Sequence, residues 1–115
     1  MLPKLRPYGR IKAKYDPKPN AAEKRHEQRL MRMPCFGCGR FGVSCHHTML
    51  KFPAKRWRRD HRFQYPLCHD CHQGDNGIHG IGNERKWLAS VGKTEAEAIA
   101  YLIAAWEYSQ GREAA

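Results

Sequence analysis

The sequence is short of acidic side chains and has no long apolar run. Asp and Glu account for 11 of the 115 residues, against 21 Lys and Arg, so the formal net charge is +10 with neutral histidines. No stretch is long and apolar enough to predict a membrane span, and residues 1–4 lack the apolar run of a signal peptide. We therefore expect a cytoplasmic protein without a membrane partner, whose cysteines stay reduced and available to metals.

The positive charge is concentrated in the first two-thirds of the chain. Residues 1–34 carry ten Lys or Arg against three acids, residues 35–80 carry seven against three, and residues 81–115 carry four against five. This distribution favours a polyanion such as nucleic acid as the partner. The alternative is a soluble basic protein with no specific ligand.

Length and residue pattern predict a single α+β domain. A chain of 115 residues with 41% hydrophobic residues supports one modest core, which often needs a metal or disulfides for stability. We expect a basic arm and short helix over residues 1–33, a compact centre over residues 34–92 and a packing helix over residues 93–115. Within the centre we expect strands over residues 43–47 and 63–67, joined by a long basic loop and followed by a short helix.

Two capping boxes indicate where helices begin. Asn20 and Glu23 form the pattern for a mostly charged helix ending near residue 33, on which we expect His26 to be solvated. Thr94 and Glu97 form the second pattern. The apolar positions behind it have helical spacing and predict a buried face: Ile99, Leu102, Ile103 and Trp106. We interpret that second helix as part of the core, without a chemical role.

Four of the five cysteines form two Cys-x-x-Cys pairs, Cys35 with Cys38 and Cys68 with Cys71. Two such pairs supply four thiolates, the closed tetrahedral ligand set of a structural zinc ion. The alternatives are two disulfides or free thiols, which fit a chain without a secretory signal less well. The 29 residues between the pairs hold two adjacent histidines and the basic loop. We interpret Cys45 as a small apolar strand residue.

Histidine is abundant, and five of the seven fall in or near a possible site: His46, His47, His61, His72 and His79. Hydrolysis of a phosphodiester needs a base that takes a proton from water and a cation that neutralises charge on the phosphate and the leaving oxygen. Histidine suits the first task because its ordinary pKa lies near neutrality. Adjacent strand residues point to opposite faces, so His46 and His47 serve one site only if the strand end bends.

The order of these motifs resembles the HNH endonucleases, which have a ββα-metal fold. The residues that carry the resemblance are Cys35-x-x-Cys38, His46-His47 and Pro66-Leu67-Cys68-x-x-Cys71-His72. A closer resemblance, to the phage RecA-dependent nucleases, covers about residues 34–92 and adds His61, Gly77-Ile78-His79, Trp87 and Gly92. The resemblance implies a small zinc-stapled ββα-metal domain, encoded by a phage or prophage and acting in the cytoplasm of a bacterial host.

The resemblance also implies roles for individual histidines. His47 takes the position of the general base, and His46 and His72 take positions of ligands to a catalytic metal. His79 is the candidate third ligand, for which Asp75 or water are alternatives.

A further catalytic position falls on His61, where many family members have an asparagine that orients the base. The implied catalytic ion is Mg²⁺ or Mn²⁺, although histidine-rich sites also take Zn²⁺ or Ni²⁺. The implied reaction is hydrolysis of phosphodiester bonds in double- or single-stranded DNA, associated with phage recombination. A RecA filament is a further partner that the resemblance implies.

The basic loop supplies candidate nucleic-acid contacts, with aromatic residues that could stack on bases. These candidates are Lys51, Lys55, Arg56, Trp57, Arg58, Arg59 and Arg62. The alternative is a solvated loop whose aromatic residues pack on the core. We find no base-reading helix and therefore expect little sequence specificity.

Three other functions stay open at this level. The chain could be a structure-specific nuclease acting on recombination intermediates, a zinc-knuckle DNA-binding module without catalysis, or a protein that binds a partner through the helix at residues 94–110. His47 favours an enzyme over a binding module, because binding alone does not require a histidine base beside His46.

Overall fold

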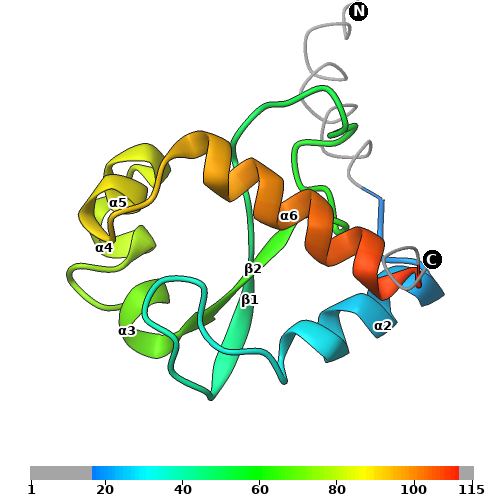
Figure 1. Ribbon diagram of the computed structural model, residues 1–115, viewed down its shortest axis with the longest axis horizontal. Coiled ribbons are helices and arrows are strands. Elements are labelled where there is room, and N and C mark those ends of the chain that lie inside the picture. The colour runs from blue at the N-terminus through cyan, green and yellow to red at the C-terminus, as the bar shows by residue number, and fades with distance from the viewer. Residues whose placement is uncertain (1–16, 112–115) are drawn as a thin grey trace, which may run out of the picture.

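The computed structural model describes residues 17–111. Its elements are, in order, α2 (Ala21–Leu30), β1 (Val43–His47), β2 (Gln64–Cys68), α3 (His69–His72), α4 (Ile78–Ile81), α5 (Glu84–Ser90) and α6 (Glu95–Ser109). The described part is therefore mixed α+β, as predicted, and its strands form a two-stranded sheet (Figure 1). Most of the predicted basic arm falls on residues 1–16, outside the described residues. None of the helices within residues 17–111 has the length and apolar character needed to cross a membrane.

The two strands pair antiparallel, from Val43 opposite Cys68 to His47 opposite Gln64. β1 has the predicted bounds, and β2 begins and ends one residue later than predicted. Every residue of β2 is buried, whereas β1 is buried only at Val43 and is exposed or half-buried beyond it. β2 therefore belongs to the core, while β1 carries its histidines toward the surface.

Both predicted capping boxes are present. The side chain of Asn20 accepts from the backbone N–H of Glu23, whose carboxylate accepts from the N–H of Asn20. Thr94 and Glu97 exchange the same two hydrogen bonds at the start of α6. A cap of this kind contributes about 1 kcal/mol. The start of each helix depends on residues only three positions apart, which explains why the sequence predicts it.

The core forms where α5 and α6 pack against the sheet. Its largest fully buried apolar side chains come from β2 and its approach, α2, α5 and α6: Trp87, Tyr65, Phe63, Leu30, Leu67, Leu88 and Leu102. On α6 the buried face is centred on Leu102, between Ala98 and Ala105. The other predicted face residues flank that centre and are partly buried: Ile99, Ile103 and Trp106. Figure 1 shows α6 running from the α5 side of the molecule to α2.

The prediction that His26 is solvated is wrong. Its exposed fraction is 1%, and its ring meets that of Trp106 edge to face at a centroid distance of 5.2 Å. Its Nδ1 is hydrogen-bonded to the hydroxyl of Ser109, 83 residues later in the chain. α2 looks charged in isolation, but one of its positions packs against α6, and only the fold brings that partner into place.

Candidate metal centres

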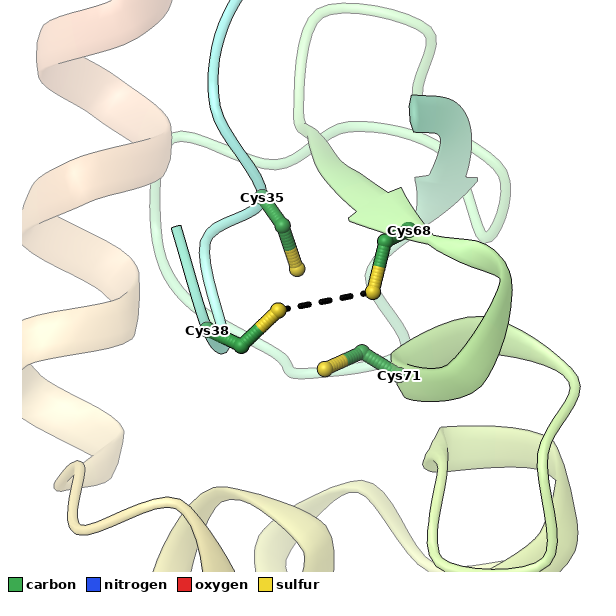
Figure 2. Close-up of side chains that lie close together, drawn as sticks. All are labelled: Cys35, Cys38, Cys68 and Cys71. Atoms are coloured by element: carbon green, nitrogen blue, oxygen red, sulfur yellow. Dashed lines mark hydrogen bonds between the residues drawn. The ribbon is translucent and has the colours of Figure 1, made fainter. Parts of the chain in front are cut away.

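The two Cys-x-x-Cys pairs converge on one point (Figure 2). The sulfur atoms of Cys35, Cys38, Cys68 and Cys71 all lie within 4.8 Å of one another, and those of Cys38 and Cys68 are 3.5 Å apart. Four sulfurs in tetrahedral contact with zinc at about 2.3 Å would be about 3.8 Å apart. All five cysteines of the chain are free rather than disulfide-bonded. The four clustered cysteines could therefore hold a zinc ion, in agreement with the predicted ligand set.

Backbone hydrogen bonds favour the thiolate form at one member of this cluster, Cys35. Cys35 and Cys38 lie in a turn, while Cys68 ends β2 and Cys71 lies on α3. Burial raises the pKa of the Cys35 thiol, but backbone N–H groups of Cys68, Cys38 and Gly37 outweigh it and bring that pKa to about 7. A thiolate is the form that binds a metal.

Cys45 is separate from this cluster. Its thiol donates to the backbone carbonyl of Glu27 on α2, over 3.7 Å. Burial, reinforced by the nearby Glu27 carboxylate, raises the pKa of Cys45 to about 11. Cys45 is thus an unionised, half-buried strand residue, as its sequence context indicated.

Three of the predicted metal-ligating histidines also come together. Ligand atoms of His46 on β1, His72 on α3 and His79 on α4 lie within 4.8 Å of one another. Nδ1 of His46 is 3.2 Å from Nε2 of His72, and the ring of His79 has its centroid 4.9 Å and 4.8 Å from theirs. The group is completed by His79 and does not include Asp75, the alternative third ligand. Whether it binds a catalytic metal stays a prediction.

Two features orient this cluster. Nδ1 of His72 is 2.9 Å from the hydroxyl of Ser44, a hydrogen bond that orients the ring with Nε2 toward His46. α4, which the sequence did not predict, packs closely against α3 and the turn after it. Gly77 meets the backbone of α3 and Gly80 meets that of the turn, both too closely for a β-carbon. That close packing brings His79 beside His72.

The electrostatics favour neutral imidazoles, which are the metal-binding form. Burial, followed by the neighbouring His72, His79 and His47, lowers the pKa of His46 to about 4. Burial, followed by His79 and His69, also lowers the pKa of His72. Both rings are therefore unprotonated at neutral pH.

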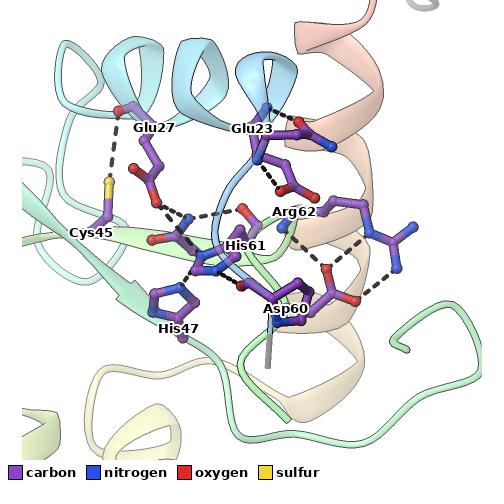
Figure 3. Close-up of polar contacts among 10 residues, drawn as sticks. Glu23, Glu27, Cys45, His47, Asp60, His61 and Arg62 are labelled. Atoms are coloured by element: carbon purple, nitrogen blue, oxygen red, sulfur yellow. Dashed lines mark hydrogen bonds and ion pairs between the residues drawn. The ribbon is translucent and has the colours of Figure 1, made fainter. Parts of the chain in front are cut away.

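His47 points away from this group, as a regular strand requires. Its Nε2 is 2.9 Å from Nδ1 of His61, which lies 3.9 Å from a carboxylate oxygen of Glu27 (Figure 3). The strand end does not bend to join the two histidines in one ligand set. His46 and His47 nevertheless border the same cavity, of about 370 Å³. Its other lining residues are Cys45, Met49, Arg58, Arg59, His72 and His79.

The sequence analysis missed two residues at these sites, Ser44 and Glu27. Ser44 stands two positions before His46, so strand alternation alone places both side chains on one face. Glu27 lies on the charged helix α2, where no local pattern distinguishes it from the other charged residues of that helix. Its position beside His61 follows from the packing of α2 on the sheet.

The basic loop divides into inward and outward residues. Arg62 pairs with Asp60 at 2.7 Å, and Lys55 donates to the backbone carbonyls of Thr48 and Leu50. These two cations are thus engaged within the protein. The outward candidates are exposed: Lys51, Arg56, Trp57, Arg58 and Arg59.

Asp60 organises the loop from inside. Its side chain is 1% exposed and accepts from the Arg62 guanidinium and from the backbone N–H groups of Arg56 and Arg62. Burial alone would raise the pKa of Asp60, but these donors outweigh it and lower that pKa to about 2. Nearby, Phe52 packs against Phe63 at a centroid distance of 5.0 Å. These contacts anchor the loop, which carries the exposed arginines beside the cavity.

Comparisons with protein-family models, with curated proteins and with solved structures found no match to this chain. The fold and the site define an α+β protein with a cysteine cluster that could bind a metal.

Proposed function

We propose that this chain is a metal-dependent DNA endonuclease of the HNH type, with a zinc-stapled ββα-metal core. One observation carries the proposal: a cluster of three histidines, a separate neutral histidine and two exposed arginines border a single cavity. Hydrolysis of a phosphodiester requires a cation, a base and positive groups for the neighbouring phosphates. Each of these roles has a residue of suitable chemistry at this cavity.

His46, His72 and His79 would hold the catalytic ion, which is Mg²⁺ or Mn²⁺ in the proposal and replaceable by Zn²⁺ or Ni²⁺. Such an ion, when bound, would neutralise charge on the scissile phosphate and on the leaving oxygen. Their convergence from β1, α3 and α4 supports this role. The cysteine cluster lies at the junction of β2 and α3, so a zinc ion there would hold His72 in position.

His47 would act as the general base. Burial, followed by the neighbouring His61 and Arg59, lowers the pKa of His47 to about 4, so its ring is neutral and can accept a proton at neutral pH. Nε2 of His47 faces His61, which leaves Nδ1 as the atom available to water. His61 is then a positioning residue, because it contacts the base rather than the substrate.

Arg58 and Arg59 would bind the phosphates on either side of the cut. Both are exposed and line the cavity. Further exposed candidates extend the surface: Lys51, Arg56 and Trp57. Contacts to phosphate carry no sequence information, so the proposal includes little sequence specificity. A phage or prophage setting, with a RecA filament as a partner, belongs to the proposal through the resemblance alone.

The test is cleavage of supercoiled plasmid and of single-stranded DNA with Mg²⁺ or Mn²⁺, with and without a RecA filament. His47→Ala should lose cleavage while it keeps its zinc and its DNA binding. His69→Ala is the matched control, because His69 is exposed and outside both histidine clusters. Cleavage only with the filament would support the narrower RecA-dependent group. Tight DNA binding without cleavage under every condition would favour a zinc-stapled binding module instead.

A further inference from the structure

We propose that Glu27, His47 and His61 form an additional site for a Zn²⁺-class cation, and that occupation of this site inactivates the base. The inhibitory consequence rests on the proposed nuclease function, whereas the binding of the cation does not. The site is distinct from the cysteine cluster and from the three-histidine cluster, since it shares no residue with either.

The geometry suits a small cation. Glu27, His47 and His61 each offer one ligand atom, and these three atoms lie within 4.8 Å of one another. The separation is 2.9 Å between the two imidazole nitrogens and 3.9 Å from His61 to Glu27. Nitrogen and oxygen ligands at about 2.0–2.2 Å from tetrahedral zinc would be about 3.3–3.6 Å apart. The two observed separations lie on either side of that range, so small side-chain shifts would complete the site.

The groups behind the ligands fit as well. Nε2 of His61 lies 2.7 Å from the carbonyl oxygen of Pro17 and must donate to it, which places the proton on Nε2 and leaves the lone pair on Nδ1. Gln64, which is 1% exposed, donates to the carboxylate of Glu27 at 2.9 Å. A backbone carbonyl behind a ligating histidine and a hydrogen bond to a ligating carboxylate are typical of metal sites.

The ligand chemistry indicates the class of ion. Two imidazoles and one carboxylate suit Zn²⁺, Co²⁺ or Ni²⁺, whereas Mg²⁺ prefers oxygen ligands and water. Three protein ligands leave a fourth tetrahedral position for water or a phosphate oxygen. Glu27 supplies the negative charge, and Figure 3 shows it reaching from α2 toward His61.

The consequence for the base follows from the tautomer. A metal on Nε2 of His47 uses the lone pair of that nitrogen, so the neutral ring carries its proton on Nδ1. Neither nitrogen can then accept a proton from water. An ion held by Glu27, His47 and His61 would therefore stop cleavage without touching the three-histidine cluster.

Zinc binding should be measured on the full-length protein by metal analysis and calorimetry at neutral pH. The wild type should bind three equivalents, one for each cluster. Glu27→Gln should weaken the additional site at least about tenfold, because even a residue behind a metal ligand contributes 10–100-fold to affinity. Glu107→Gln is the matched control, since Glu107 is exposed and on α6, outside all three clusters. Retained zinc at the cysteine cluster and an unchanged circular dichroism spectrum would show that each variant is folded.

A second readout is inhibition of Mg²⁺-dependent cleavage by added Zn²⁺, normalised to the zinc-free rate of each variant. Glu27→Gln should need at least about tenfold more Zn²⁺ for half-inhibition, and Glu107→Gln should match the wild type. A Glu27→Gln variant that binds as many equivalents of zinc as the wild type, with the same affinities, would overturn the inference. If the protein does not cut DNA but Glu27 still controls the third equivalent, the site stands and the nuclease proposal falls.

Discussion

The hydroxyl of Ser44 on β1 lies 2.9 Å from Nδ1 of His72 on α3. This contact links the strand that carries His46 to the helix that carries His72, and it orients the His72 ring so that Nε2 faces Nδ1 of His46. Two candidate ligands from different elements are thus held in a fixed relation before any ion arrives.

Ser44→Ala should weaken metal binding at the three-histidine cluster by about 10–100-fold, because an outer hydrogen bond fixes the orientation of the ligating ring. Calorimetry with Mn²⁺ on protein that carries a single equivalent of zinc, at the cysteine cluster, measures this directly. Ser90→Ala on α5 is a suitable control, since the Ser90 hydroxyl bonds only the backbone carbonyl of Trp87. Equal Mn²⁺ affinities in the wild type and Ser44→Ala would show that Ser44 does not orient a metal ligand.

Loss of one clustered cysteine should destabilise the whole domain. Cys38→Ser should lose tightly bound zinc and lower the free energy of unfolding by more than about 4 kcal/mol, because loss of a structural metal is among the few single changes of that size. Thermal unfolding followed by circular dichroism, with metal analysis, provides the measurement. Cys45→Ser should keep its zinc, since Cys45 lies outside the cluster. Zinc loss in both variants, or in neither, would contradict the four-cysteine assignment.

Acid should destabilise the protein through His26. Burial, followed by Arg29, lowers the pKa of His26 from 6.5 to about 4 in the folded state. The folded state therefore binds a proton at His26 more weakly than the unfolded state does. The contribution of His26 to the free energy of unfolding is fully present above pH 6.5 and is lost as the pH falls from 6.5 to about 4. The loss attributable to His26 should approach about 3 kcal/mol.

The measurement for His26 is denaturant unfolding across that pH range, compared between the wild type and His26→Gln. Acid also affects the cysteine cluster, but that contribution is common to both proteins and cancels in the difference. His69→Gln serves as the control, because His69 is exposed. A pH dependence that is the same in the wild type and His26→Gln would show that His26 does not cause it.

Arg58 and Arg59 should contribute to DNA affinity through charge. The double variant Arg58→Ala/Arg59→Ala should bind duplex DNA more weakly, and the slope of log affinity against log salt should decrease by about 0.9 for each phosphate contact removed. Fluorescence anisotropy at several salt concentrations gives both quantities. Lys86→Ala on α5 is the control, because Lys86 is exposed and is not one of the residues that line the cavity. An unchanged slope would exclude the two arginines from the interface.

Arg62 should instead matter for folding. Arg62→Ala leaves the carboxylate of Asp60, which is 1% exposed, without its ion-pair partner. Breaking a buried pair in this way costs about 3–5 kcal/mol. Urea unfolding of Arg62→Ala beside Arg58→Ala tests the distinction, because Arg58 is exposed and should have little effect. Equal free energies of unfolding for the two variants would show that the Arg62–Asp60 ion pair does not stabilise the fold.

Much of the local structure follows from short-range signals in the sequence. The capping boxes at Asn20 and Thr94, the strand over residues 43–47 and the α+β class were all predicted, since each depends on neighbouring residues. The four-cysteine set was predicted for a similar reason. Cys-x-x-Cys spacing in a turn brings two sulfurs to one side, so two pairs need only to meet.

The tertiary structure decided which side chains share a site. Strand alternation predicts that His46 and His47 diverge, but only the packing of α3 and α4 assembles His46, His72 and His79. The close approach of Gly77 and Gly80 that positions α4 depends on backbone contacts that the sequence does not reveal.

Burial and long-range pairing were likewise decided by the fold. His26 and Glu27 are neighbours on a charged helix, yet one is buried against α6 and the other half-buried beside His61. By itself the sequence determined both strands, the capped helix starts, the cysteine ligand set and the excess of positive charge. The side-chain hydrogen bonds of His26, His46, His47 and His72 join residues that lie 14 to 83 positions apart in the chain. Local propensity carries no information about contacts at that separation, because packing of the whole chain selects them.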